Sequence, residues 1–238
     1  MSIVNRSVPM VLTVMVLASP LHASAAQVST RSADPGAHAS ALLDGSDCGA
    51  LLLNADGGYE NAVSWQYGQV VPPFYGAFAE CYSGDVGVCA VVIDYTQLGS
   101  WTGKASTVFV WADAGGVPGD VLCMKTTTLP SPLAWPGVSR AVVQLATACC
   151  VSGSWWVGVW GDWPNDAADY FVAADNNGPG GCPRTCIAPG LGIPTGWIDA
   201  SAIWPMQALG LGAEWNPCVP VPSAPRTWGR VKALYRES

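Results

Sequence analysis

Short apolar runs of period two, separated by turn-forming residues, limit this chain to an all-β fold. Clusters of Asp, Asn, Gly and Pro separate the runs, for example at 56–58, 113–119 and 175–181. About ten strands at this spacing, with no convincing helical pattern, predict a β-sandwich or a barrel. The clearest runs are rich in β-branched and aromatic residues; they are Val88–Thr96, Ala105–Ala112, Ser139–Thr147 and Ser154–Trp160.

Charged residues make up only 11% of the chain, against roughly 25% in ordinary soluble domains. This composition argues against long solvated helices joined by ion pairs. Ten Lys and Arg residues against seventeen Asp and Glu residues give a net charge of −7. A nucleic-acid-binding surface is basic, so we expect no nucleic-acid partner for this acidic chain.

Residues 1–26 have the pattern of a secretory signal peptide. Arg6 supplies the positive charge, Val8–Ala18 is a mostly apolar run, and Ala23–Ala25 is a small-residue cleavage site. A membrane anchor is the alternative, but the run is shorter than the roughly 20 residues that span a bilayer. No later stretch is long and apolar enough to span one. We therefore expect a mature protein that is secreted or held at the cell surface.

The rest of the chain divides by composition into four parts. Residues 27–44 form a flexible lead-in, and residues 45–217 form one dense β domain. Residues 218–226 are a proline-rich spacer, and residues 227–238 are a basic tail. We expect the tail to be a sorting or anchoring signal read by secretion machinery, or a docking peptide for an acidic partner. A frayed terminus is the plain alternative.

Nine cysteines follow the signal segment, in a compartment where disulfides persist. No C-x-x-C pair of the kind typical of zinc sites occurs, so disulfides are the preferred interpretation. The turn-rich loop between Cys81 and Cys89 favours a hairpin closed by these two residues. Cys182 and Cys186 either staple their own short loop or reach elsewhere.

The adjacent residues Cys149 and Cys150 lie in a predicted strand. Successive side chains of a strand point to opposite faces, so these two cysteines should have different partners. Because nine is an odd number, one thiol is left over or pairs between molecules.

Three segments of the chain carry a family resemblance. They are Asp56–Trp65, the D-x-G-G-x-P-G turn within Val110–Gly119, and the W-G-R-V-K-x-L-Y-R ending within Thr227–Arg236. In these segments the chain resembles uncharacterised secreted bacterial β-sandwich domains of the jelly-roll kind, which precede short C-terminal sorting or anchoring tails. The resemblance implies a single two-layer antiparallel sandwich and export, and it implies no particular chemistry.

The mature chain is almost without histidine, because His22 leaves with the signal and His38 lies in the lead-in. Ser–His–Asp and Cys–His catalysis are therefore not expected in the domain. A glycoside hydrolase would need two carboxylates across a cleft. The acidic residues that could supply such carboxylates include Asp94, which is the one acid inside an apolar strand. They also include the glutamates of the domain, Glu60, Glu80 and Glu214.

Oxygen-bearing side chains gather in one glycine-rich loop. Asn54, Asp56 and Glu60 supply the hard ligands that Ca²⁺ prefers, and residues 175–177 form a second such cluster. Neither has the spacing of an EF-hand, and Asx and Gly residues also form plain turns. We expect calcium as the one candidate cofactor, held by the first loop.

Tryptophan is the most unusual residue in the composition, with twelve copies. In the strand 154–160, Trp155 and Trp156 must face opposite ways, so one packs in the core while the other meets solvent or a loop. Exposed aromatic rings beside acidic and amide groups form platforms for sugars, and filling of the core is the alternative role. The residues expected to form such a ligand site are Trp156, Trp160, Asp162, Trp163 and Asn165.

Together these patterns predict a secreted, disulfide-stapled β-sandwich. Its expected function is that of a non-enzymatic binding or structural module, with a polysaccharide or a cell-surface component as partner. The alternative is a carboxylate-dependent, carbohydrate-active enzyme on the same scaffold.

Overall fold

The computed structural model describes residues 48–65, 74–99, 101–161 and 170–218. The predicted segments 1–26, 27–44 and 227–238, and the spacer after its first residue, lie outside these ranges. The described residues form thirteen strands and one 3-10 turn, η1 (Ala200–Ala202). The strands are β1 (Ala50–Leu53), β2 (Asn61–Val63), β3 (Phe78–Ser83), β4 (Val86–Thr96), β5 (Ala105–Asp113), β6 (Pro118–Thr128), β7 (Ser139–Val151), β8 (Ser154–Gly161), β9 (Phe171–Asp175), β10 (Arg184–Ile187), β11 (Gly196–Asp199), β12 (Ala208–Leu209) and β13 (Leu211–Asn216).

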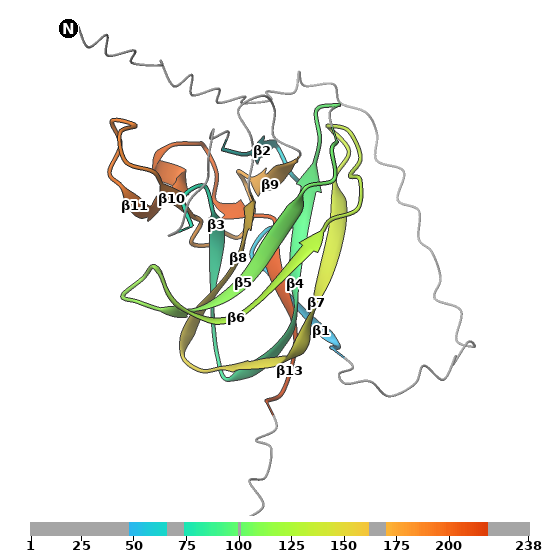
Figure 1. The fold of residues 1–238 in the computed structure, drawn as a ribbon, viewed down its shortest axis with the longest axis vertical. Coiled ribbons are helices and arrows are strands. Elements are labelled where there is room, and N and C mark those ends of the chain that lie inside the picture. Colours follow the sequence, from blue (N-terminus) through green and yellow to red (C-terminus); the bar gives the residue numbers. More distant parts are fainter. Residues whose placement is uncertain (1–47, 66–73, 100, 162–169, 219–238) are drawn as a thin grey trace, which may run out of the picture.

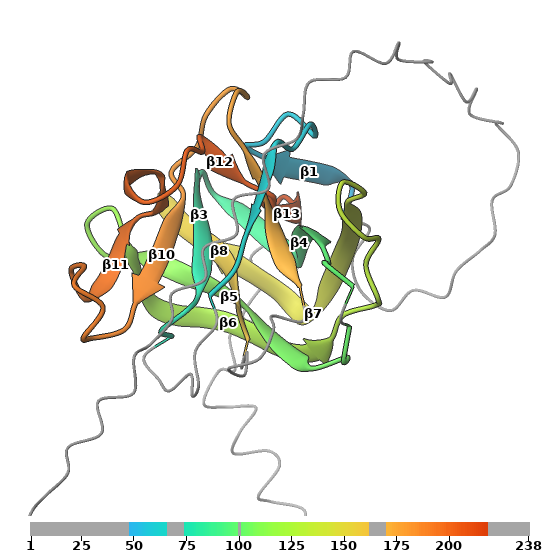
Figure 2. The same ribbon diagram turned by 90° about the horizontal axis from the view of Figure 1, so that it is seen from above.

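Two antiparallel sheets form the body of the protein, which confirms the predicted sandwich (Figure 1, Figure 2). The first sheet has the order β1-β13-β4-β9-β12, with β2 paired to β9 and β7 paired to β4. The second sheet has the order β11-β10-β3-β8-β5-β6. The described residues contain no helix long and apolar enough to cross a membrane.

The main core lies between the two sheets and is built from alternate strand residues. Val91 and Ile93 of β4, together with Val108 of β5 and Val157 of β8, are fully buried in it. β4 is buried along its whole length, which accounts for its nearly continuous apolar sequence. A strand covered on both faces has no solvent side that would require polar residues.

A second, smaller cluster covers the other face of the second sheet. Trp155 points into the main core, whereas its neighbour Trp156 belongs to the second cluster, as strand alternation requires. Phe109 and Trp111 stack there with ring centroids 4.9 Å apart, and Trp197 of β11 meets Trp111 edge-on at 5.6 Å. Tryptophan therefore fills two layers of packing in this fold.

Four disulfides join the described cysteines, and one predicted pair is wrong. Cys81 bonds to Cys182 and Cys89 bonds to Cys48, so no Cys81–Cys89 hairpin exists. The reason is topological, because β3 and β4 are consecutive strands that belong to different sheets. The other two bonds are Cys123–Cys149 and Cys150–Cys218.

The remaining cysteine predictions are settled by the same bonds. Cys149 and Cys150 have different partners, as their adjacent positions in β7 predicted. Cys182 does not bond to Cys186, because Cys182 is joined to β3. Cys186 takes part in none of the four disulfides and is buried, and burial raises the pKa of its thiol to about 12.

Candidate functional site

The structure buries Trp156, one of the residues of the predicted ligand platform. Trp156 is only 2% exposed, and its indole N–H donates to Asp113 Oδ1 at 2.8 Å. The guanidinium carbon of Arg184 lies 5.8 Å from the centroid of its ring. Trp156 is thus covered by its own chain, and the prediction that it stacks on a ligand is wrong.

The rest of the predicted platform is only partly described. Trp160 is partly buried and donates its indole N–H to the carbonyl of Tyr75 at 3.1 Å. Asp162, Trp163 and Asn165 lie outside the described residues.

The D-x-G-G-x-P-G turn covers Trp156, and its hydrogen bonds and backbone conformation account for its Asp and Gly residues. Asp113 accepts the backbone N–H groups of Gly115 and Gly116, each at 3.1 Å, besides that of the indole. These hydrogen bonds lower the pKa of Asp113 below its ordinary value. Both glycines have positive φ (77° and 88°), a conformation that other residues rarely adopt. The motif is therefore accounted for as a structural turn.

The predicted calcium ligands are engaged by separate partners. Asn54 donates to Glu80 Oε1 at 3.0 Å, and Asp56 accepts the N–H of Gly58 at 2.7 Å. Glu60 accepts from Asn176 and Asn177, so the two predicted clusters are tied directly to each other. No group of three or more His, Cys, Asp or Glu side chains in the described ranges is arranged to hold a metal ion. The structure thus gives no support to this ligand set.

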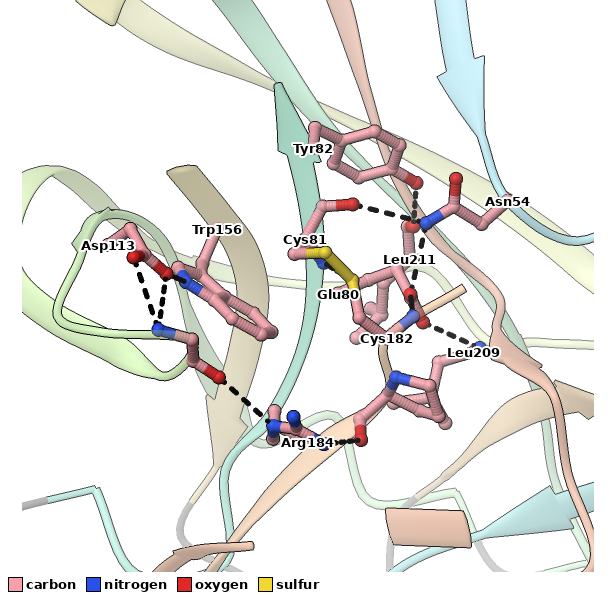
Figure 3. The surroundings of a disulfide bond; sticks show 12 residues. Asn54, Glu80, Cys81, Tyr82, Asp113, Trp156, Cys182, Arg184, Leu209 and Leu211 are labelled. Carbon is pink, nitrogen blue, oxygen red and sulfur yellow. Dashed lines mark hydrogen bonds between the residues drawn. A yellow bond between two sulfur atoms is a disulfide. The ribbon is translucent and has the colours of Figure 1, made fainter. Parts of the chain in front are cut away.

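Glu80 is a buried carboxylate on β3 that joins the two sheets (Figure 3). Its Oε1 accepts from Asn54 and from the backbone N–H of Cys182. Its Oε2 accepts from the N–H of Leu209, in the other sheet, at 2.9 Å. Burial raises the pKa of Glu80 to about 7, against the opposing effect of these donors. Because its oxygens are taken up by the protein itself, Glu80 acts as a structural clamp.

Asp94 of β4 is a second buried carboxylate, and its oxygens accept hydrogen bonds from neighbouring side chains. Arg140 of β7 donates to it through Nε at 2.7 Å and through a terminal nitrogen at 2.6 Å. Tyr59 donates its hydroxyl to the same carboxylate. Burial and the neighbouring Asp94 raise the pKa of Tyr59, and the hydrogen bond to Asp94 raises the pKa of Arg140. Asp94 thereby fixes the position of the guanidinium at the surface.

Arg140 lies at one side of a groove of about 340 Å³ between β6 and β7. These strands are the free edges of the two different sheets, and no strand pairing joins them. They are linked instead by the Cys123–Cys149 disulfide and by Lys125, which donates through Nζ to the carbonyl of Gln144 at 2.6 Å. The residues that line the groove are Lys125, Thr127, Thr128, Leu129, Pro130, Arg140, Ala141, Val142, Val143 and Gln144.

The lining of this groove contains two cations and no carboxylate, and one of the cations, Arg140, is ion-paired with Asp94 behind it. Lys125 is exposed, and the side chain of Arg140 is 41% exposed. Neither residue was predicted from the sequence. Arg140 is an isolated cation within the predicted strand Ser139–Thr147, but only the fold shows that β6 and β7 face each other across an opening.

Comparisons with known proteins found no match to this chain, whether among protein-family models, curated proteins or solved structures.

Proposed function

We propose that this protein is an extracellular binding module that holds an extended, anionic ligand in the groove between β6 and β7. The observation that carries the proposal is the meeting of two long, unpaired strand edges at a groove lined by Lys125 and Arg140. Groups that are not paired within the protein remain available to a ligand. Four disulfides suit an oxidising extracellular compartment.

The arrangement of carboxylates favours binding over glycoside hydrolysis. Such hydrolysis needs two carboxylates flanking the scissile bond, and the groove lining has none. The buried carboxylates of Glu80 and Asp94 are bound by their own chain, and so is that of Asp175, which accepts from the backbone of residues 56, 177 and 178. An acidic polysaccharide, as well as an acidic peptide, satisfies the charge of the groove.

The proposal is tested by screening for ligands and then filling the groove. Wild-type protein is applied to an array of acidic and neutral polysaccharides and to an array of acidic and basic peptides. In Thr127→Trp an indole occupies the groove, while Thr126→Trp places the same ring on the neighbouring residue, which does not line it. We expect acidic ligands to bind the wild type and to lose at least about tenfold in affinity with Thr127→Trp only.

Two outcomes would contradict the proposal. One is the absence of any acidic ligand on both arrays. The other is an equal loss of affinity in Thr127→Trp and Thr126→Trp, which would place binding elsewhere on the protein. Near-UV circular dichroism of both variants checks that the sandwich is retained.

A further inference from the structure

We infer that the groove binds an extended acidic polypeptide segment, which pairs with the free edge of β7 as an additional strand. This inference rests on the proposed function, and it names the chemical class of the ligand. It is argued from three features of the described residues: the direction of the backbone groups, the charge of the lining, and the regularity of the strand edge.

The backbone of β7 presents hydrogen-bonding groups to the groove. The carbonyl of Gln144 points across the gap, since it accepts from Lys125. In an antiparallel ladder, alternate residues direct both their N–H and C=O groups to the same side. Val142 and Arg140 are therefore expected to direct theirs into the groove as well.

The ladder between β4 and β7 agrees with this assignment. Arg140 lies opposite Asp94, whose backbone N–H donates to Gly210 on the other side of β4. Arg140 and Asp94 thus form a pair without mutual backbone hydrogen bonds, so the backbone groups of Arg140 point away from β4. The backbone groups that point away from β4 recur at every second residue, about 6.8 Å apart. This spacing matches the backbone of another polypeptide strand.

The charge of the groove determines which polypeptides fit. Lys125 supplies positive charge to the groove, whereas the charge of Arg140 is offset by its ion pair with Asp94. Lys125 disfavours a basic segment such as residues 227–238, which carry Arg230, Lys232 and Arg236. An incoming N–H can replace the Lys125 ammonium on the carbonyl of Gln144, and the released ammonium can then pair with an acidic side chain.

The apolar residues of the groove suit a peptide in which apolar and polar side chains alternate. Ala141 and Val143 are buried and belong to the main core, whereas Val142 between them is 42% exposed. A strand added beside β7 would therefore place alternate side chains towards the core and towards solvent. Its favoured pattern is one of alternating apolar and acidic residues.

Edge protection is the competing explanation for this region, because bulges and lysines commonly shield free strands. The irregularity of β7 lies opposite Cys89, where the register with β4 shifts between Val88 and Ala90. The stretch from Arg140 to Gln144 keeps a continuous register with β4. The irregularity of β7 therefore lies next to the proposed docking stretch, and the stretch itself stays regular.

The test uses NMR titration of the whole protein with defined probes. The first probe is a capped heptapeptide of alternating Glu and Val, and the second replaces each Glu by Lys. The third is the Glu peptide with N-methyl groups on alternate backbone nitrogens, and the fourth is polygalacturonate. We expect the first peptide alone to shift the amide signals of residues 140–144.

Two variants locate the interaction. Lys125→Glu reverses the charge in the groove, and Lys104→Glu makes the same change at a lysine that does not line it. Val142→Pro removes an edge N–H while the charges stay, and proline is tolerated at strand edges. We expect Lys125→Glu and Val142→Pro each to weaken binding of the Glu peptide at least about tenfold, and Lys104→Glu to leave it within about twofold.

The outcomes separate this inference from the proposed function. If polygalacturonate shifts residues 140–144 and the Glu peptide does not, the ligand class is wrong while the groove remains a binding site. Equal binding of the N-methylated peptide would also overturn strand pairing. If no acidic probe shifts these residues, both the inference and the proposed function fail.

Discussion

At the scale of single residues, Glu80 links acidity to stability. The folded protein holds its proton more tightly than the unfolded chain, because burial raises the pKa from 4.5 to about 7. At a pH between these two pKa values, Glu80 is ionised in the unfolded chain and still largely protonated in the folded protein. The contribution of Glu80 to stability is therefore greatest at low pH and falls as the pH rises through this range.

Replacing Glu80 by Gln should reduce this pH dependence. The amide cannot ionise, so we expect the change in Tm between about pH 5 and about pH 8 to be smaller in Glu80→Gln than in the wild type. The variant should also be less stable at both pH values by about 1–3 kcal/mol, because an amide N–H₂ replaces one oxygen that accepts a backbone hydrogen bond. Thermal denaturation followed by circular dichroism measures both effects. Parallel curves of Tm against pH would refute the assignment.

Asp113 shows how a single residue can produce a recognisable motif without a binding role. Its carboxylate organises the turn and accepts the indole N–H of Trp156. From the sequence, Trp156 was expected to form a ligand platform together with Asp162. In the fold, its indole N–H is bonded to Asp113, which lies 43 residues away in the sequence.

At the scale of strands, Gly158 sets how closely β8 lies between its neighbours. A Cβ at this position would come within 2.0 Å of the carbonyl oxygen of Phe78 on β3 and within 2.9 Å of Trp111 on β5. The backbone of β3 and the indole of Trp111 cannot move away without disturbing closely packed neighbours. Glycine is therefore required in the middle of an otherwise bulky strand.

Gly158→Ala should destabilise the protein by about 3 kcal/mol or more, because the added methyl group overlaps backbone atoms. Gly49→Ala is the matched control, since a Cβ there meets nothing within 4 Å. Urea denaturation of the two variants measures the difference in unfolding free energy. A cost for Gly158→Ala below that of Gly49→Ala would contradict the packing described for β8.

At the scale of the whole molecule, the disulfides join segments that are distant in the sequence. Cys81–Cys182 spans 101 residues and ties β3 to the segment before β10. Cys123–Cys149 connects the two sheets at the edge of the groove. These bonds restrict the unfolded chain and hold the edges of β6 and β7 close together without pairing them.

Thiol titration should find a single, protected cysteine. The native protein at about pH 8 should react negligibly with a thiol reagent, because Cys186 is buried and its pKa is raised to about 12. In denaturant without reductant, one thiol per chain should react. Mass spectrometry of unreduced fragments should then place the label on Cys186 and link Cys81 to Cys182. A linked Cys81–Cys89 fragment would overturn the bonding described here.

The predictable part of this protein followed from local patterns. Alternation located the long strands, and it correctly placed Trp155 and Trp156 on opposite faces and gave Cys149 and Cys150 different partners. The short strands β10 (Arg184–Ile187) and β12 (Ala208–Leu209) were missed. The prediction that Trp156 faces a ligand was wrong, since a residue type does not reveal whether a distant turn covers it.

The amino-acid sequence by itself determined that the chain forms sheets, because side-chain alternation and turn residues act over a few neighbouring positions. Only the tertiary structure decided which cysteines bond, which carboxylates are satisfied internally, and which strand edges remain unpaired. Those properties depend on contacts between residues tens of positions apart, as between Lys125 and Gln144 or between Asp94 and Arg140. The candidate groove is a property of this second kind, since β6 and β7 acquire a shared opening only when the two sheets pack together.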